Sequence, residues 1–532
     1  MYECPNCGGN LKFDITSQQL ACSFCDTHMR PYDVDKETDA VETDYFETTV
    51  FTCPQCGGEI FSGDNEAASF CSFCGASTIL SSRISKEKRP QYIIPFKKTK
   101  EDCKKAYEKK MRFAFFVPDE LKDAKHIESF RGIYMPYWTY QLSQNQHVTL
   151  NGKKSHRSGD YVITEHYHLT GDLNALYLGY SKDASANFYD NLSETLAPFD
   201  AKELVKFTPS YLSGFYADTA DVEEDVYLEE VMGLAEENSF ERICKEPKFK
   251  GYDVDSGKNK NNLRSKLGTV CRTTDRTMYP VWFLSYRNKD RVAYAAVNGQ
   301  TGKVAVDLPI DMKKYMFTSL ILAVIIFVLL NLFLTIKPTT LMMIGCLLAL
   351  GSAALYAKEL NDIYKKEHFI DDLGMQEKIA DEESLYEEGN DKKKKNKKTF
   401  SVKDFLKKHW ITMIWFMVVF GQLGIMFLYA MVVLVWPLIL TGTVICGVIG
   451  IKKCKKTGDI RKTPGFIVSM IMVGIAVVIR LINPVSDSYY YLGAVLALVA
   501  VLFNMMDVIS NYNRLVMRRL PQFDRKGGDD RA

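Results

Sequence analysis

The sequence lacks the short motifs that mark common catalytic sites. It contains no Gly-x-Ser-x-Gly and no His-Glu-x-x-His, and GQTGK at residues 299–303 lacks the spacing of a phosphate-binding loop. His166 and His168 share one face of a predicted strand, but no third metal ligand accompanies them in the sequence. We therefore predict a protein that binds or scaffolds and that is not an enzyme.

An excess of charge of either sign is also absent, because 67 lysines and arginines stand against 65 acidic residues. Overall charge thus gives no indication of the partner. The N-terminus, MYECPNC, has neither the basic nor the apolar region of a signal peptide, so we expect it to stay in the cytoplasm, where thiols remain reduced. Six scattered cysteines do not suggest a disulfide framework: Cys103, Cys244, Cys271, Cys346, Cys446 and Cys454.

The other eight cysteines form two repeats of the pattern Cys-x2-Cys-x14-Cys-x2-Cys. The first set is Cys4, Cys7, Cys22 and Cys25, and the second is Cys53, Cys56, Cys71 and Cys74. Each set predicts a zinc ribbon with a closed tetrahedral Cys4 shell, which is the geometry of a structural rather than a catalytic site. Two structural Zn²⁺ ions are therefore the predicted cofactors. A redox dithiol and an iron site are the alternatives, but a redox dithiol normally has a single Cys-x-x-Cys beside a βαβ pattern, which is absent here.

The ligand of the ribbons stays open, since zinc ribbons bind nucleic acids or proteins or serve stability alone. We predict ribbon 1 over residues 1–30, an acidic linker over 31–50, ribbon 2 over 51–80 and a basic linker over 81–98. The basic linker supplies candidate contacts to nucleic acid or anionic lipid, unless it is simply a solvated segment. These candidates are Arg83, Lys86, Lys88 and Arg89.

Residues 99–312 show the mixed periodicities of an α+β cytoplasmic domain. Thr99 is the expected N-cap of a helix that buries Cys103, Ala106, Tyr107, Met111 and Ala114 on one face. YVITEHYHLTG alternates like a half-buried strand, the acidic stretch 221–246 predicts a second helix, and residues 291–307 predict a β-hairpin. Pro-x-Trp occurs in two aromatic strands, which favours a duplicated β-unit over two unrelated core strands: Pro136/Trp138 and Pro280/Trp282.

The second part of the sequence contains long apolar runs that predict six membrane spans. They are Met316–Ile336, Thr339–Ala357, two spans within Ile411–Ile451 joined by a turn near Leu428–Val432, Pro464–Ile482 and Tyr489–Ile509. The corresponding divisions are helices 1–2 in residues 313–357, a charged loop in 358–409, helices 3–6 in 410–510 and a basic tail in 511–532. Because the basic loops fall on one side of this arrangement, we expect a multi-pass protein of the cell membrane with both termini in the cytoplasm.

Ionisable residues within the predicted spans are scarce, which argues against a transporter or channel. Arg480 and Asp507 are expected near opposite membrane faces, each close to its own interface. Gln422 and Asn504 are interpreted as interhelical hydrogen-bonding groups. A lysine run in the charged loop either contacts anionic lipid or forms a solvated segment, and both interpretations stay open. The run includes Lys392, Lys393, Lys394 and Lys395.

Several stretches carry a resemblance to a known family. In order, they are CPNCGG, CPQCGG, GIYMPYWTY, KFTPSYLSGFYAD and MYPVWFLSYRNKDRVAYAAVNGQTGKVAVDLPID. Over most of residues 1–357 the chain resembles bacterial membrane proteins with TFIIB-type zinc ribbons, commonly from Gram-positive bacteria. Some of these are similar to membrane anchors of phage-shock protein A homologues, and others are labelled primosomal helicases, although this chain has no helicase motor motif. The four helices predicted after Ile411 depart from the simplest family pattern.

Taken together, these features predict a multidomain chain with two small β zinc ribbons, an α+β cytoplasmic domain and an α-helical membrane bundle. The function they favour is a non-enzymatic membrane adaptor that docks cytoplasmic protein partners at the lipid bilayer. The resemblance implies a phage-shock protein A-like partner or other membrane-complex subunits, and an envelope-stress response. A membrane-tethered nucleic-acid-binding protein is the alternative, and a transporter or channel component is a further one.

Overall fold

The chain forms two compact units in the computed structural model. The described residues are 2–36, 45–62, 71–75, 81–159, 161–186, 188–254, 266–333, 337–368, 370–376, 424–456 and 464–519. The first unit, here the sheet domain, comprises Met1–Leu308, Phe369–Asp381 and Met517–Ala532. The second, here the helical unit, comprises Pro309–His368 and Glu382–Val516.

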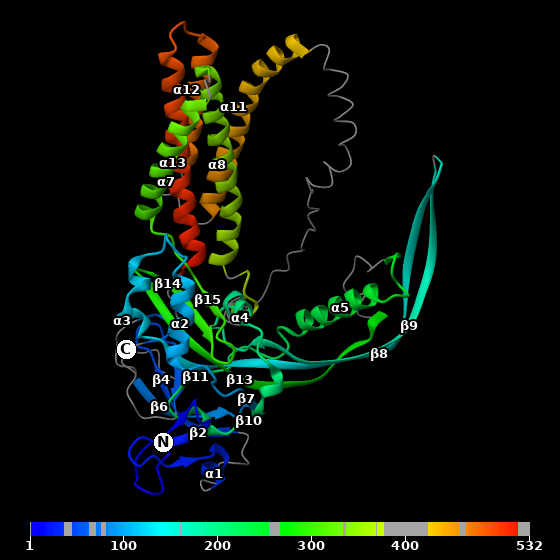
Figure 1. Ribbon diagram of the computed structural model, residues 1–532, viewed down its shortest axis with the longest axis vertical. Helices are drawn as coiled ribbons and strands as arrows, with labels where there is room; N and C mark the ends of the chain where they lie inside the picture. The colour runs from blue at the N-terminus through cyan, green and yellow to red at the C-terminus, as the bar shows by residue number, and fades with distance from the viewer. Residues whose placement is uncertain are drawn as a thin grey trace, which may run out of the picture. The chain divides into compact units, whose positions relative to one another are not determined.

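The sheet domain contains a small sheet and a large one (Figure 1). The small antiparallel sheet is β1 (Leu11–Asp14), β2 (Gln19–Cys22) and β3 (His28–Met29), followed by helix α1 (Pro31–Lys36). The large sheet has 13 strands. They are β4 (Tyr45–Thr52), β5 (Glu59–Ser62), β6 (Ser81–Lys88), β7 (Tyr92–Ile93), β8 (Arg131–Ser158), β9 (Tyr161–Asp183), β10 (Val205–Lys206), β11 (Tyr216–Asp218), β12 (Asp253–Val254), β13 (Thr269–Asn288), β14 (Arg291–Asn298), β15 (Val304–Val306) and β16 (Arg518–Arg519).

Residues 81–98 do not form the linker that the sequence predicted. Their first eight residues are strand β6, which pairs with β4 along its whole length, from Tyr45↔Lys88 to Thr52↔Ser81. β6 ends the main strand order, and a lysine- and serine-rich composition is typical of such edge strands, where charge discourages pairing with other chains. The strands of ribbon 2 therefore belong to the large sheet and are not a separate module.

Helices of the sheet domain follow the predicted pattern more closely. They are α2 (Lys100–Met111), α3 (Ala124–Ile127), α4 (Asp190–Leu196) and α5 (Leu228–Lys245), with 3₁₀ turns η1 (Asp119–Lys122), η2 (Ala201–Glu203) and η3 (Pro209–Leu212). Thr99 caps α2 in a reciprocal capping box with Asp102, and α2 buries Cys103, Tyr107 and Met111 as expected. Burial also raises the pKa of the Cys103 thiol, so this cysteine is a packing residue rather than a nucleophile.

The centre of the large sheet is the antiparallel pair β8–β13, which carries both Pro-x-Trp sequences. Their register is symmetric about the pair Met135↔Tyr279. The Trp138 indole N–H donates to Val222 O, and the Trp282 indole N–H donates to Lys98 O, both at 2.8 Å. This matched pairing supports the interpretation of a duplicated β-unit.

The strands β8 and β9 form a long curved ribbon, along whose inner side α5 lies (Figure 1). The predicted strand YVITEHYHLTG is the first part of β9, but it is mostly exposed and not half-buried as predicted. Helix α5 falls within the stretch 221–246 that predicted a helix. His166 and His168 are exposed on this ribbon, and His168 Nδ1 lies 3.1 Å from Asn151 Oδ1. Within the described residues they form no metal-binding cluster.

Two segments that follow membrane-type helices in the sequence belong to the sheet domain. Arg518 in β16 stacks over the Tyr189 ring at 3.8 Å and lies 3.6 Å from Asp371 and 3.9 Å from Asp372. The backbone N–H of Leu373 donates to Asp190 Oδ2 at 2.9 Å, and that of Gly374 donates to the Tyr227 hydroxyl at 3.1 Å. The sheet domain thereby holds residues 370–376 and 517–519 through one polar network.

The helical unit consists of α7 (Met312–Phe333), α8 (Pro338–Glu367), α11 (Gly424–Lys456), α12 (Pro464–Ile482) and α13 (Ser488–Val516) among the described residues. In the described part of the chain, four helices are long and apolar enough to cross a membrane: Pro338–Glu367, Val435–Lys455, Gly465–Ile482 and Ser488–Val516. α7 coincides with the first predicted span. Residues 411–423, which the predicted third span requires, and Gln422 with them, lie outside the described residues.

The turn predicted near Leu428–Val432 is wrong, because α11 is one continuous helix from Gly424 to Lys456. The segment LYAMV contains no proline, glycine or asparagine that would end a helix. Pro437 lies inside α11 without ending it. The turn was predicted only because the apolar run Ile411–Ile451 is long, and a long apolar run can also form one long helix.

Asn504 joins three helices, as the sequence predicted. Its amide donates to Ser469 Oγ on α12 and Ser352 Oγ on α8, both at 2.8 Å. Asp507 accepts from the backbone N–H of Gly465 at the start of α12, whereas Arg480 donates to Asn483 at the other end of that helix. The two charged residues therefore make their contacts at opposite ends of α12.

Replacing Asn504 by leucine is expected to weaken the helical unit by about 1 kcal/mol, because interhelical hydrogen bonds in membranes are modest. Reversible unfolding of the full chain in detergent checks this, with Val495→Ala on the exposed face of α13 as the control. An equal effect of both variants would show that Asn504 contributes no more than a methyl contact.

Candidate metal centres and the exposed knuckle

Four short turns, called knuckles here, carry the cysteine pairs and share one hydrogen-bond pattern. The backbone N–H of Gly8 donates to Cys4 O, and that of Gly57 donates to Cys53 O, both at 2.8 Å. Asp26 and Gly75 repeat this bond to Cys22 O and Cys71 O at 3.0 Å. All four donors have a positive φ, which explains the glycines at three of these positions. The repeated local sequence thus produces the same turn four times.

The thiols of each set converge as a tetrahedral metal site requires. Sγ–Sγ distances are 3.4 Å for Cys4–Cys25 and 3.5 Å for Cys7–Cys22. In the second set they are 3.8 Å for Cys53–Cys74 and 3.7 Å for Cys56–Cys71. A ZnS₄ tetrahedron with bonds of about 2.3 Å has edges near 3.8 Å, so the second set matches Zn²⁺ and the first set needs to widen only slightly. They are the two metal-type clusters found within the described residues.

The second Cys4 set lies inside the sheet domain. Its four cysteines are all buried, together with Phe51, Ile60 and Phe73. The Phe73 ring makes an edge contact with Phe283 of β13, and the Tyr294 hydroxyl donates to Phe73 O at 2.7 Å. Ribbon 2 is therefore part of a core, whereas the sequence predicted a small ribbon between two linkers.

The first Cys4 set has a free side. Cys7 and Cys25 are exposed, while Cys4 and Cys22 are buried. Phe24, in the knuckle between Cys22 and Cys25, is 81% exposed. Ribbon 2 has the same four residues, Cys-Ser-Phe-Cys, at 71–74, yet there Phe73 is only 1% exposed. Identical local sequences therefore present one phenylalanine to a core and the other to solvent.

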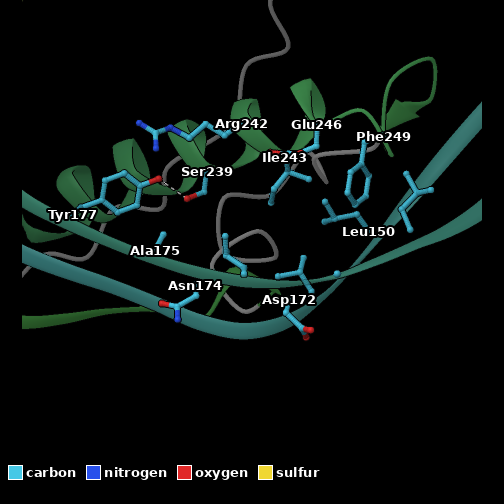
Figure 2. Close-up of a pocket in the computed structure, with 14 residues that line it drawn as sticks. Leu150, Asp172, Asn174, Ala175, Tyr177, Ser239, Arg242, Ile243, Glu246 and Phe249 are labelled. Atoms are coloured by element: carbon cyan, nitrogen blue, oxygen red, sulfur yellow. Dashed lines mark hydrogen bonds between the residues drawn. The ribbon is translucent and has the colours of Figure 1, made fainter.

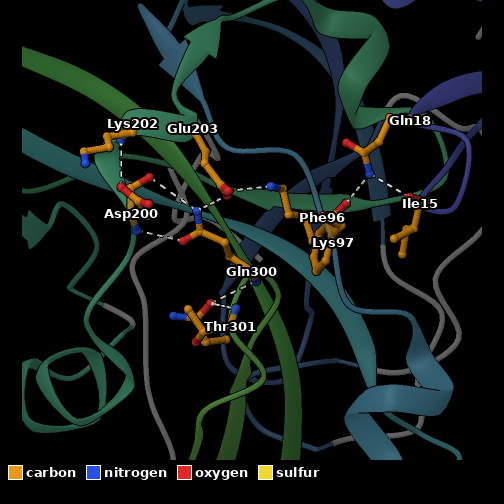
Figure 3. A network of polar contacts seen from close by, with 10 residues as sticks. Ile15, Gln18, Phe96, Lys97, Asp200, Lys202, Glu203, Gln300 and Thr301 are labelled. Carbon is orange, nitrogen blue, oxygen red and sulfur yellow. Dashed lines mark hydrogen bonds and ion pairs between the residues drawn. The ribbon is translucent and has the colours of Figure 1, made fainter.

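Ribbon 1 is fixed to the sheet domain at several points. Gln18 Nε2 donates to Phe96 O at 2.7 Å as well as to Ile15 O (Figure 3). The Phe13 N–H donates to Ser213 O at 3.0 Å, and the Ser213 hydroxyl donates to Leu11 O at 2.5 Å. Nearby, Lys97 pairs with Glu203, which also accepts from Gln300 (Figure 3). The exposed knuckle is thus held on a rigid base.

Further contacts of ribbon 1 centre on a buried aspartate. The Tyr2 hydroxyl donates to Asp35 Oδ1 at 2.5 Å, and the Thr208 hydroxyl and the Ser210 N–H donate to Oδ2. Burial together with the Asp35 charge raises the pKa of Tyr2, so its hydroxyl remains a donor. Thr208 and Ser210 lie in the stretch KFTPSYLSGFYAD, whose fold role is therefore to seat ribbon 1.

The predicted basic contacts are not brought together in the described part of the chain. Arg89 donates to Phe207 O at 3.2 Å and lies over the Phe207 ring, while Lys88 is exposed. Arg83 and Lys86 belong to β6, and their side chains are outside the described set. The run Lys392–Lys395 lies wholly outside the described residues. Arg89 thus has an intramolecular role that the sequence did not indicate.

A cavity of about 300 Å³ opens between α5 and the β8–β9 ribbon (Figure 2). Its apolar lining residues include Leu150 from β8, Ile243 from α5 and Phe249 from the segment after α5. Tyr177 and Ser239, at one end, are hydrogen-bonded to each other at 2.6 Å. Arg242 and Glu246 lie at the side formed by α5. The lining thus combines apolar residues with polar groups at one end and one side.

Comparison with known proteins gives one informative relative. The "Uncharacterized protein YdjG" of Bacillus subtilis (strain 168) is 35% identical over 320 residues, which cover 59% of this chain and 91% of that protein. The chain belongs to the YdjG family. Bacillus subtilis is a Gram-positive bacterium, in agreement with the family that the sequence resembles. The comparison does not test the link to phage-shock protein A. No family model and no solved structure matches the chain.

Proposed function

We propose that this protein is a non-enzymatic membrane adaptor that docks a cytoplasmic protein partner through the exposed knuckle of ribbon 1. Its helices would cross the cell membrane several times with both termini in the cytoplasm, an orientation supported by the basic loops of the sequence. The two Cys4 sites would hold Zn²⁺ with different tasks. Ribbon 2 stabilises the sheet domain, and ribbon 1 recognises the partner.

The observation that carries this proposal is the contrast between Phe24 and Phe73. Phe73 shows how a Cys-Ser-Phe-Cys knuckle binds a protein surface: its ring enters an aromatic cluster, and a tyrosine hydroxyl donates to its carbonyl. Phe24 offers the same ring on the same turn but with 81% of its surface exposed. An exposed aromatic anchor on a rigid base is typical of an interface hot spot, because little conformational entropy is lost on binding.

The partner is accordingly expected to offer an apolar, aromatic-lined pocket. Burying one phenylalanine side chain contributes about 2–3 kcal/mol. That is too little for stable binding alone, so flanking contacts with ribbon 1 are also expected. The family resemblance supports a homologue of phage-shock protein A, or another subunit of a membrane complex, as this partner, and an envelope-stress response as its setting.

In vivo photo-crosslinking tests the proposal with the full chain. A photoreactive amino acid is placed at position 24 and, as a control, at position 161, since Tyr161 is similarly exposed at 78% on the tip of the β8–β9 ribbon. We expect a specific protein adduct from position 24 that position 161 does not give and that disappears in the Cys7→Ser/Cys25→Ser background. Adducts dominated by nucleic acid, or indistinguishable adducts at the two positions, would refute protein docking at the knuckle.

A further inference from the structure

A second exposed surface lies at the C-terminal end of α2. It comprises Lys109, Lys110, Arg112, Phe113 and Phe115 and is called the α2 apex here. All five residues are exposed, and the two rings remain 74% and 71% accessible. Two large aromatic side chains and three cations thus lie within seven consecutive positions, 109–115.

Local structure explains only part of this composition. Cations in the last turn of a helix stabilise it through the helix dipole, which accounts for Lys109 and Lys110. The aromatic pair has no such explanation, because the neighbouring Met111 and Val117 already fill the core and are 3% and 4% exposed. A solvated turn would normally carry polar residues at positions 113 and 115.

The cations of the apex have no acidic partner in the part of the chain that the structure describes. Within the described residues no ion pair involves Lys109, Lys110 or Arg112. One turn earlier, by contrast, Lys104 pairs with Glu128 at 2.5 Å. The acidic residues closest in sequence are Glu108, Asp119 and Glu120, and Glu120 accepts from the Tyr286 hydroxyl at 2.7 Å. The apex therefore keeps a net positive charge beside its exposed rings.

The apex is also rigidly held. α2 is fixed at one end by the Thr99 capping box and along its length by the buried Cys103, Tyr107 and Met111. The Tyr107 hydroxyl donates to Leu121 O at 3.0 Å, which fastens the turn that follows the apex. The rings are thus presented on a fixed scaffold rather than on a free loop.

In the sequence, β15, against which α2 packs, is followed after residues 307–311 by α7, which overlaps the first predicted membrane span.

We propose that the α2 apex binds the surface of an anionic lipid bilayer. Phe113 and Phe115 enter the boundary between headgroups and acyl chains, where aromatic rings are favoured, and the three cations contact lipid phosphates. Three basic groups near an anionic surface raise membrane affinity by about 100-fold. This contact is independent of the ribbon 1 partner.

The test uses the full chain reconstituted in nanodiscs of phosphatidylcholine with or without phosphatidylglycerol. An environment-sensitive fluorescent amino acid replaces Phe113 or, as a matched control, Tyr161. With phosphatidylglycerol present, we expect a blue-shifted emission at position 113 that brominated lipids quench, and neither effect at position 161. The variant Lys109→Glu/Lys110→Glu/Arg112→Glu is expected to lose the shift and the quenching, with circular dichroism confirming its fold.

Three outcomes would overturn the proposal. The first is a probe at position 113 that stays solvated in both nanodisc types. The second is a blue shift without quenching by brominated lipids, which would assign the apex to a protein contact. The third is equal quenching in the presence and absence of anionic lipid and in the charge-reversed variant, which would exclude the electrostatic contact.

Discussion

Replacing Cys53 and Cys56 by serine is expected to unfold most of the sheet domain, whereas Cys7→Ser/Cys25→Ser unfolds ribbon 1 alone. The second Cys4 set is wholly buried, and its strands are paired into the 13-stranded sheet. A structural zinc site contributes on the order of 10–16 kcal/mol, which is comparable to the whole stability of a typical domain. The first set borders solvent, so its loss leaves the large sheet paired.

Hydrogen exchange of the full chain separates the two results. In the Cys53→Ser/Cys56→Ser variant, amides of β8 and β13 should lose most of their protection, and in the Cys7→Ser/Cys25→Ser variant only those of residues 2–36 should. Zinc content should fall from two ions per chain to one in the ribbon 1 variant. Retained protection of β8 and β13 without the second zinc would contradict the structural role assigned to ribbon 2.

The second large effect concerns pH and the segment 370–376. Burial, reinforced by the neighbouring Asp190 charge, raises the pKa of Asp372 to about 7. The groups around it are Asp190 of α4, Tyr227 at the start of α5, Asp371 of its own segment, Arg518 of β16 and, at the end of β9, Asp183. One arginine thus faces several carboxyl groups, and burial also raises the pKa values of Asp183 and Asp190.

The sign of the pH effect follows from proton uptake. In the unfolded segment Asp372 titrates near its ordinary value of 3.8, whereas in the folded protein it titrates near 7. Between these values the folded state binds more protons, so the segment is held less tightly as the pH rises from about 4 to about 7. At 1.36 kcal/mol for each pKa unit, the loss is at most about 4 kcal/mol.

Hydrogen exchange at residues 373–375 measures this directly, since their amides are bonded to Asp190, Tyr227 and Asp372. After correction for intrinsic rates, we expect greater protection at pH 6 than at pH 8. Asp372→Asn should raise protection at pH 8 and flatten most of the pH dependence, because asparagine keeps the acceptor for Met375 without the charge. Asp371→Asn, which is more exposed, is the control, and an equal effect of the two variants would contradict the assignment to Asp372.

Features specified by short stretches of sequence were the ones that the sequence predicted well. The Cys-x2-Cys spacing fixes the knuckles, Thr99 and Asp102 fix the start of α2, and residues 291–307 form β14 and β15 as expected. Asn504 was identified because an amide within an apolar helix requires partners on neighbouring helices. In each case the physical cause lies within a few residues of the feature.

Features decided by distant contacts were missed. Cys-Ser-Phe-Cys occurs in both ribbons, and nothing within those four residues indicates that Phe73 meets Phe283 while Phe24 meets solvent. β6 was interpreted as a linker because an edge strand need not be apolar, and its pairing with β4 is visible only in the fold. The packing of Asp372 and Arg518 in the sheet domain likewise has no local signal in the sequence. It depends on contacts with residues that are distant in the chain, some of them 180 or more positions away.

The central claim is that one ribbon stabilises the fold and the other docks a protein partner. The most direct test is the variant Phe24→Ser in the full chain, with co-purified proteins, zinc content and hydrogen exchange measured on the same preparation. We predict two zinc ions, unchanged protection of ribbon 1 and the large sheet, and loss of the partner. A partner that is retained at the wild-type level by this intact variant would contradict the claim.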